Sequence, residues 1–159
     1  MKICTFAGHR TVYDSSVADK LTAAIQDFLQ TDNEFCFYSG GMGQFDRLCE
    51  WAVRKAQREN PHLKMELILV LPYLTNALNQ NKEYYESSFD GILVPSELIG
   101  VHYKGAIQKR NRWMVNHSDY LLAYVRQDFG GAYQTLQYVR RKPEMTILNL
   151  ADCERKQNQ

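Results

Sequence analysis

Short apolar runs alternate with amphipathic segments along nearly the whole chain. Several of these runs are apolar at almost every position, as in Leu67-Ile68-Leu69-Val70-Leu71. A continuous apolar run is typical of a strand that is covered on both faces, as strands of parallel sheets are. The predicted strands are residues 2–7, 34–38, 65–71, 91–94, 120–125 and 145–150.

Between the runs, apolar residues recur at helical spacing. In the second such segment Phe45, Cys49, Ala52 and Ala56 fall on one face. The predicted helices are residues 17–29, about 45–60, 81–89, 104–117 and 131–142. Strands that alternate with helices predict an α/β protein with a Rossmann-like, doubly wound, mainly parallel sheet of about six strands and helices on both faces. We expect one domain over residues 1–151, followed by a polar C-terminal tail at 152–159.

The composition is that of an ordinary soluble protein, with 45% hydrophobic and 23% charged residues. The first predicted strand begins at Lys2, which leaves no room for a signal peptide, and no apolar stretch approaches the roughly 20 residues that cross a bilayer. We therefore expect a cytoplasmic protein without a membrane partner. The 19 basic and 18 acidic side chains give a net charge of +1, which argues against nucleic acid as a partner.

The four cysteines lack the CxxC spacing of zinc and redox sites. Cys4, Cys36 and Cys49 lie inside apolar runs, whereas Cys153 lies in the polar tail. We interpret them as small, reduced residues, mainly of the core, and expect no metal site and no required cofactor.

Unusual residues collect where the predicted strands end. In an open parallel sheet, ligands bind outside the carboxyl ends of the strands. Gly8-His9-Arg10 follows the first strand and Pro72-Tyr73 the third. Two glycine clusters, Ser39-Gly40-Gly41-Met42-Gly43 and Gly130-Gly131, each follow a strand and open a helix.

These glycine clusters predict phosphate-binding turns. Glycine permits a positive φ and the close approach of a ligand, and a helix N-terminus offers unpaired N–H groups and partial positive charge. Neither cluster matches the dinucleotide GxGxxG motif or a P-loop, so the argument rests on position. The alternative is that both are tight strand-to-helix turns without a ligand.

Charged and aromatic residues near these turns are further candidates. Asp46 lies in the first turn of the second helix. Its carboxylate either interacts favourably with the positive end of the helix dipole or hydrogen-bonds a ribose hydroxyl. Arg110 opens a helical segment where a cation opposes the helix dipole, which favours a nearby anionic ligand, and Arg10 could pair with phosphate. Packing or base stacking would suit the aromatic residues Tyr73, Trp113 and Tyr133.

In the order of these motifs the chain resembles the SLOG superfamily. The matching pieces are Ala7-Gly8-His9-Arg10, Ser39 to Asp46, Leu69 to Pro72, Arg110 to Val115, His117-Ser118-Asp119 and Gly130 to Thr135. This superfamily joins the LOG phosphoribohydrolases, the Rossmann domain of the DNA-processing protein DprA, and the bacterial YpsA-like family of unknown function. The YpsA-like branch is the most similar. The resemblance implies a Rossmann-like domain that binds nucleotide-type ligands, and the dimeric LOG relatives imply a homodimer.

The LOG branch cleaves the N-glycosidic bond of nucleoside 5′-monophosphates with an arginine and a glutamate. By resemblance Arg110 matches the arginine, because it precedes Met114 by four residues, and Gln137 occupies the glutamate position. An amide cannot stabilise oxocarbenium character or activate water as a carboxylate does. Either Asp46 supplies the acid or the protein binds without hydrolysis.

The residues and the resemblance together leave three functions open. The first is a sensor or regulatory module for AMP, ADP-ribose or an NAD-derived ligand, the second a LOG-like N-glycosidase, and the third DprA-like nucleic-acid binding, which the balanced charge disfavours. The predicted catalytic residues are Arg110, Asp46 and Gln137. The predicted ligand-binding residues are Gly8, His9, Arg10, Ser39, Gly40, Gly41, Gly43, Asp46, Pro72, Tyr73, Arg110, Asn111, Gly130, Gly131 and Thr135.

Overall fold

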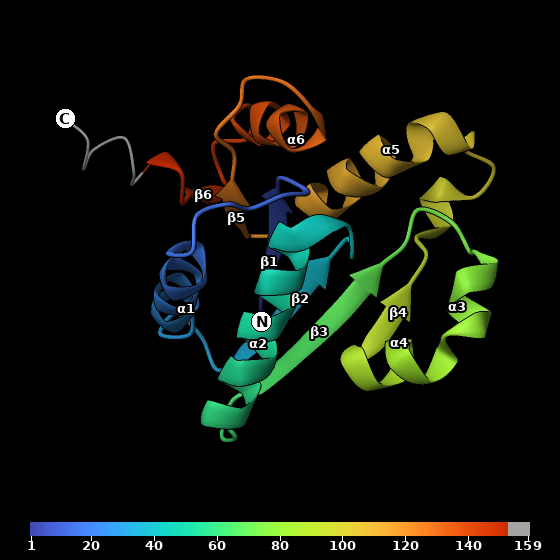
Figure 1. The fold of residues 1–159 in the computed structure, drawn as a ribbon. Coiled ribbons are helices and arrows are strands. Elements are labelled where there is room, and N and C mark those ends of the chain that lie inside the picture. The colour runs from blue at the N-terminus through green and yellow to red at the C-terminus, as the bar shows by residue number, and fades with distance from the viewer. Residues whose placement is uncertain (153–159) are drawn as a thin grey trace.

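Six parallel strands form one sheet at the centre of the molecule (Figure 1). The computed structural model describes residues 1–152. The strands lie in the order β4-β3-β2-β1-β5-β6. Their bounds are β1 Lys2–Gly8, β2 Glu34–Ser39, β3 Lys64–Val70, β4 Gly91–Leu93, β5 Tyr120–Tyr124 and β6 Thr146–Asn149. All six predicted strands are confirmed, each to within one residue at either end.

Within residues 1–152, six α-helices and one 3₁₀ turn connect the strands. They are α1 Val17–Phe28, α2 Gly43–Glu59, α3 Asn76–Gln80, α4 Lys82–Ser88, η1 Ser96–Leu98, α5 Tyr103–Asn116 and α6 Gly131–Val139. The prediction missed the short α3, which has no buried residue and hence no apolar stripe. The predicted last helix ran to residue 142, three residues past the observed end of α6.

Helices cover both faces of the sheet, which confirms the doubly wound α/β prediction. On one face Phe6 of β1 packs with the apolar stripes of α1 and α2, including Leu21 and Phe45. On the other face Ala7 packs with Val115 of α5 and Leu136 of α6. Each large side chain buried in this way contributes about 1.5–3 kcal/mol, so tertiary packing holds the helices in place.

The strand order reverses between β1 and β5. From β1 the chain builds outward through β2, β3 and β4, and it then returns to place β5 on the other side of β1. The register pairs Gly8 with Tyr124, so the two strands end together and their loops leave the sheet side by side. A reversal of this kind is the point where open α/β sheets form a ligand crevice.

Cys4, Cys36 and Cys49 are buried free thiols, as predicted. Cys153 and the predicted tail beyond residue 152 lie outside the described residues. Over residues 1–152, no helix is both long enough and apolar enough to span a membrane.

Candidate functional site

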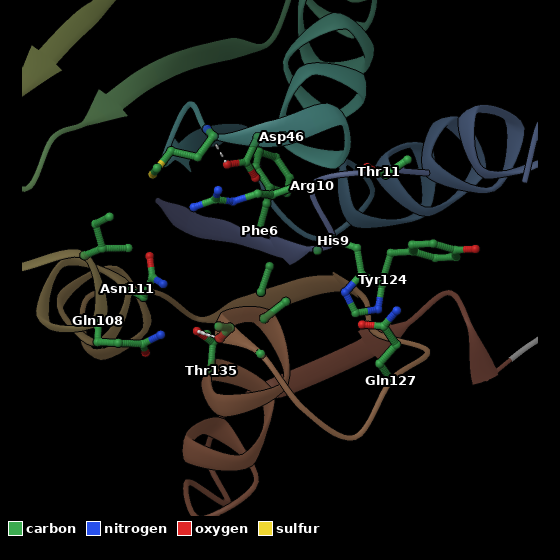
Figure 2. A pocket seen from close by; sticks show the side chains of 18 of the residues that line it. Phe6, His9, Arg10, Thr11, Asp46, Gln108, Asn111, Tyr124, Gln127 and Thr135 are labelled. Carbon is green, nitrogen blue, oxygen red and sulfur yellow. Dashed lines mark hydrogen bonds between the residues drawn. The ribbon is translucent and has the colours of Figure 1, made fainter. Parts of the chain in front are cut away.

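A cleft of about 960 Å³ opens at the β1–β5 switch point. Its walls come from the loops after β1 and β5, from α5, and from the N-termini of α2 and α6. Figure 2 shows His9 and Gln127 of the two loops, Gln108 and Asn111 of α5, and Thr135 of α6 around the same space. The predicted ligand-binding residues in its lining are Gly8, His9, Arg10, Gly40, Asp46, Arg110, Asn111, Gly130, Gly131 and Thr135.

Hydrogen bonds tie the loops of the cleft to each other and to α2. The Nε2 atom of His9 accepts from the backbone N–H of Arg126 at 2.8 Å. The carbonyl of Arg10 accepts from the N–H of Gln44 at 2.8 Å, and the Gln44 side-chain oxygen accepts from the N–H of Val12 at 2.7 Å. Burial, and then the charge of Arg126, lower the pKa of His9, which favours the neutral ring that can accept this bond.

The glycine turn after β2 (residues 40–43) owes its glycines to packing. Gly41 and Gly43 have φ values of +66° and +89°. A Cβ on Gly41 would lie 2.6 Å from Leu69, and one on Gly43 would lie 2.7 Å from the Cα of Arg10. Both glycines are required by the fold itself, and neither lines the cleft.

Gly8 is also fixed by packing, because a Cβ there would overlap the ring of Phe45. Phe45 is fully buried and stacks on Tyr124, with 6.0 Å between ring centroids. A residue larger than glycine at the end of β1 would therefore push α2 away from the sheet. Gly8 lines the cleft through its backbone.

Asp46 reaches back to the glycine turn from the first turn of α2. Its Oδ2 atom accepts from the N–H of Met42 at 2.9 Å. Burial raises the pKa of Asp46 to about 7, against the lowering effects of the Met42 hydrogen bond and of Arg110. A buried carboxyl with a raised pKa in a cleft lining is a candidate functional group.

Arg110 is 2% exposed and is engaged with the backbone. Its Nη1 atom donates to the carbonyls of Gly40 and Val70 at 3.1 and 3.0 Å, and its Nε atom donates to the Asn111 side chain. Burial lowers the pKa of Arg110, whereas the charge of Asp46 raises it. Arg110 therefore joins the glycine turn to the end of β3, and a direct contact with a ligand stays a prediction.

The turn before α6 is open toward the cleft. Gly130 has a φ of +93°, and beyond its chain neighbours no atom lies within 4 Å of the position a Cβ would take. Thr135 donates its hydroxyl hydrogen to the Gly131 carbonyl at 3.0 Å and so closes the first turn of α6. The exposed side chains of Arg10 and Arg126 also line the cleft. Positive charge and a helix N-terminus thus face one space.

Five predicted binding residues lie outside this cleft. Gly41, Pro72 and Tyr73 line a second cavity of about 320 Å³ on the other side of the glycine turn. Ser39 is fully buried and donates to Glu50 at 2.6 Å, and Gly43 packs under Arg10. The structure thus separates the predicted set into a cleft, a second cavity and a packing layer.

Gln137, predicted as a catalytic position, lies on α6 outside both cavities. Its Nε2 atom donates to the Tyr133 hydroxyl at 2.7 Å, and its Oε1 atom accepts from Arg140 at 2.9 Å. Trp113 packs between Tyr38 and His117. Both Trp113 and Tyr133 lie outside the cleft lining.

Sequence reasoning missed several cleft residues, notably Tyr13, Gln108, Gln127 and Phe129. Tyr13 and the pair Gln127 and Phe129 lie on the loops after β1 and β5, which the pairing of these strands brings side by side. Gln108 comes from α5. Within residues 1–152, no three His, Cys, Asp or Glu side chains gather closely enough to hold a metal ion.

The chain was compared with known proteins by sequence and by structure. No family model matches the chain. The chain is 25% identical over 138 residues to the uncharacterized SPbeta prophage-derived protein YoqJ of Bacillus subtilis (strain 168), covering 77% of this chain and 80% of that protein.

Two solved structures share the fold. DNA processing protein A (DprA) of Helicobacter pylori, studied for its single-stranded DNA binding mode, matches 92% of this chain with a TM-score of 0.61 and 16% identity. DprA of Streptococcus pneumoniae matches 95% with a TM-score of 0.51 and 13% identity. The chain spans 64% and 59% of these two proteins. At this identity the likeness shows a Rossmann-like fold of the DprA type.

The expectation that charge argues against a nucleic-acid partner is wrong. A protein known for binding single-stranded DNA has this fold over nearly the whole length of the chain. The net charge of +1 averages over the whole surface, whereas Arg10 and Arg126 gather at the cleft. Local charge, and not the total, decides whether a phosphate can approach.

Proposed function

We propose that the chain binds a nucleotide in the switch-point cleft, with a phosphate at the N-terminus of α6 and Arg10 and Arg126 beside it. AMP, ADP-ribose and NAD-derived molecules carry this chemistry. The protein then acts as a sensor or regulatory module. One observation carries the proposal: the open Gly130 turn and the start of α6 face the same cleft as the two arginines.

The choice of α6 over α2 follows from where the N-terminal N–H groups point. At α2 the N–H groups of Met42 and Gln44 already donate to Asp46 and to the Arg10 carbonyl. At α6 the preceding Gly130 leaves open space in which a phosphate oxygen can approach the backbone. A helix N-terminus binds an anion only where its donors are accessible.

The decisive experiment is calorimetric titration of Gly131→Ala with AMP. Gly131 has an ordinary negative φ, and an added Cβ would meet only the flexible end of Gln108, at 3.2 Å. The fold should therefore tolerate alanine, while the methyl group adds bulk to the cleft lining at the first residue of α6. We expect the affinity for AMP to fall about tenfold or more, equivalent to about 1.4 kcal/mol.

Gly105→Ala is the matched control. Gly105 lies inside α5, and a Cβ there meets nothing within 4 Å, so this variant should bind AMP normally and gain about 1 kcal/mol of stability. If Gly131→Ala binds AMP as tightly as the unaltered chain, the phosphate does not lie at α6.

Single-stranded DNA is the second candidate ligand, and the second cavity favours it. The cleft and this cavity share Gly40 and Met42 of the glycine turn and Ile107 and Arg110 of α5, so the two spaces adjoin. Nucleotides joined in a strand could occupy both, whereas one mononucleotide fills one. The likeness to the single-stranded DNA-binding protein of Helicobacter pylori supports the same candidate. Fluorescence anisotropy with a labelled ten-nucleotide thymidine strand tests it, because tighter binding of the strand than of AMP is then expected.

We also assign the chain to the SLOG superfamily. The ordered motifs and the DprA-type fold support the assignment. A position closest to the YpsA-like branch remains a prediction that rests on the motifs.

A further inference from the structure

Two large aromatic side chains stand in solvent at the edge of the cleft. Tyr13, on the loop after β1, is 89% exposed, and Phe129, on the loop after β5, is 64% exposed. Both line the switch-point cleft, although they are more than 100 residues apart in the sequence. Neither ring belongs to the buried core, so core packing does not explain either residue.

The backbone around both rings is held in place. Val12 and Ser16, on either side of Tyr13, donate their backbone N–H groups to Gln44 and Asp14. Phe129 lies between Arg126, whose N–H donates to His9, and the start of α6. The two loops thus present the rings from a supported frame, which lowers the entropic cost of binding a planar group.

Charge complements the rings. Arg10 and Arg126 are exposed in the same cleft, so an anionic group and a planar apolar group can be bound together. A nucleobase linked through a sugar to a phosphate has this combination, whereas an inorganic anion or an aliphatic chain has only one half of it. Base stacking on an aromatic ring contributes to affinity whatever the base, because every base has a π face.

We propose that Tyr13 and Phe129 are the base-binding residues of the cleft and stack on the nucleobase of the bound ligand. This inference rests on the proposed function, because it takes the phosphate at α6 as given. It adds that the base is held at the outer edge of the cleft by stacking, and that recognition of the base is tolerant of its identity.

The test compares AMP with ribose 5-phosphate, which lacks the base. Calorimetric titrations use the unaltered chain, Tyr13→Ala and Phe129→Ala. Each alanine variant should lose about tenfold or more in affinity for AMP and change less than twofold for ribose 5-phosphate. Tyr13→Phe and Phe129→Tyr, which keep a ring, should restore AMP binding.

Trp51→Ala is the control, because Trp51 is an exposed aromatic residue on α2 outside the cleft, and it should bind AMP normally. If AMP binds the unaltered chain and both alanine variants equally, the stacking proposal fails and the proposed function stands. A parallel loss of ribose 5-phosphate binding also overturns stacking, because the damage would then lie in the loops. If the unaltered chain binds neither AMP nor the thymidine strand, both proposals fail.

The labelled thymidine strand distinguishes the two sources of the base. A strand that binds more tightly than AMP, and loses affinity in both alanine variants, identifies the ligand as single-stranded DNA. A strand that binds more weakly, with the loss seen for AMP, identifies a free nucleotide. If neither substitution changes the affinity for the strand or for AMP, the proposal that the two rings stack on the base is contradicted.

Discussion

The imidazole of His9 accepts a hydrogen bond from the backbone N–H of Arg126 at 2.8 Å, and so joins the loops on either side of the strand-order reversal. The bond requires a neutral ring with its proton on Nδ1. Because Tyr13 and Phe129 lie on these two loops, the same bond helps to set the separation between the two rings. His9 is therefore a positioning residue of the cleft.

The first prediction concerns His9 and pH. Burial lowers the pKa of His9 in the folded protein, so the unfolded chain binds its proton first as pH falls. This group's contribution to stability is present above the unfolded pKa of about 6.5 and is lost as pH falls through that value and then through the folded pKa. We expect urea denaturation to show a smaller loss of stability between pH 7.5 and 5 in His9→Gln than in the unaltered chain. His62→Gln, at an exposed position, is the control. If His9→Gln and the unaltered chain lost the same stability between pH 7.5 and 5, the lowered pKa of His9 would be contradicted.

Asp46 gives a pH dependence of the opposite sign. Its pKa is raised to about 7, so between about pH 4 and pH 7 the unfolded chain releases a proton that the folded protein keeps. This contribution to stability is complete below about pH 4 and is lost as pH rises through about 7. Asp46→Asn keeps an acceptor for the Met42 N–H but does not titrate, so its stability relative to the unaltered chain should rise from pH 5 to pH 8. Asp128→Asn, at an exposed position, is the control. If the difference in stability between Asp46→Asn and the unaltered chain did not change with pH, the raised pKa of Asp46 would be contradicted.

The alternation of apolar runs and amphipathic segments was enough to predict the six strands and the helices on both faces of the sheet. The two glycine clusters looked alike in sequence, and only packing separates them. Gly41 and Gly43 are crowded by Leu69 and Arg10, whereas Gly130 faces open space. Local sequence carries no information about which residue from a distant segment will fill the space beside a glycine.

The arginine and the aromatic residues show the same limit. The prediction for Arg110 rested on a cation near the start of a helix, and this premise is wrong, because Arg110 lies in the middle of α5 (Tyr103–Asn116). Its side chain is buried against two backbone carbonyls whose position depends on the sheet. Tyr13 and Phe129 were missed because lone aromatic residues in loops form no pattern. Their proximity follows from strand order, which the sequence patterns did not specify.

Replacement of Arg110 distinguishes a structural role for this residue from a ligand-binding role. Arg110→Met removes a guanidinium that hydrogen-bonds two buried carbonyls, and each such bond to a charged group is worth about 1.5–3 kcal/mol. We expect urea denaturation to show a loss of about 3 kcal/mol or more, against less than about 0.5 kcal/mol for the exposed Lys109→Met. A stable Arg110→Met protein that no longer binds AMP would instead identify Arg110 as a ligand-binding residue.

Salt dependence reports how many phosphates a bound strand contacts. If Arg10 and Arg126 each meet one phosphate of single-stranded DNA, the logarithm of affinity should fall with the logarithm of salt concentration with a slope of about −1.4. Arg126→Gln should reduce the magnitude of that slope by about 0.7, and Arg141→Gln, which removes an equal charge outside the cleft, should leave it unchanged. A much steeper slope in anisotropy titrations would mean that the strand follows a longer basic path than the cleft provides.

The last prediction separates binding from hydrolysis and concerns Gln137. By resemblance this residue stands at the LOG glutamate position, but its side chain lies outside the cleft and bonds to Tyr133 and Arg140. We expect the unaltered chain to bind AMP without releasing adenine, as measured by chromatography. Gln137→Glu should also be inactive, because the new carboxylate would pair with Arg140 on the surface of α6 and would not reach the glycosidic bond.

Adenine release by Gln137→Glu alone would show that residue 137 does reach the cleft. It would also show that the unaltered chain lacks hydrolase activity because it has no carboxylate at this position. Adenine release by the unaltered chain would contradict the proposal that the chain binds AMP without hydrolysing it. The variant Asp46→Asn would then test whether Asp46 is the catalytic acid. Asp46 is the carboxylate that lines the cleft, with a pKa of about 7, so its replacement should abolish turnover while AMP still binds. Persistent turnover in Asp46→Asn would exclude Asp46 as the acid, because an amide can neither donate that proton nor stabilise the positive charge that develops on the sugar.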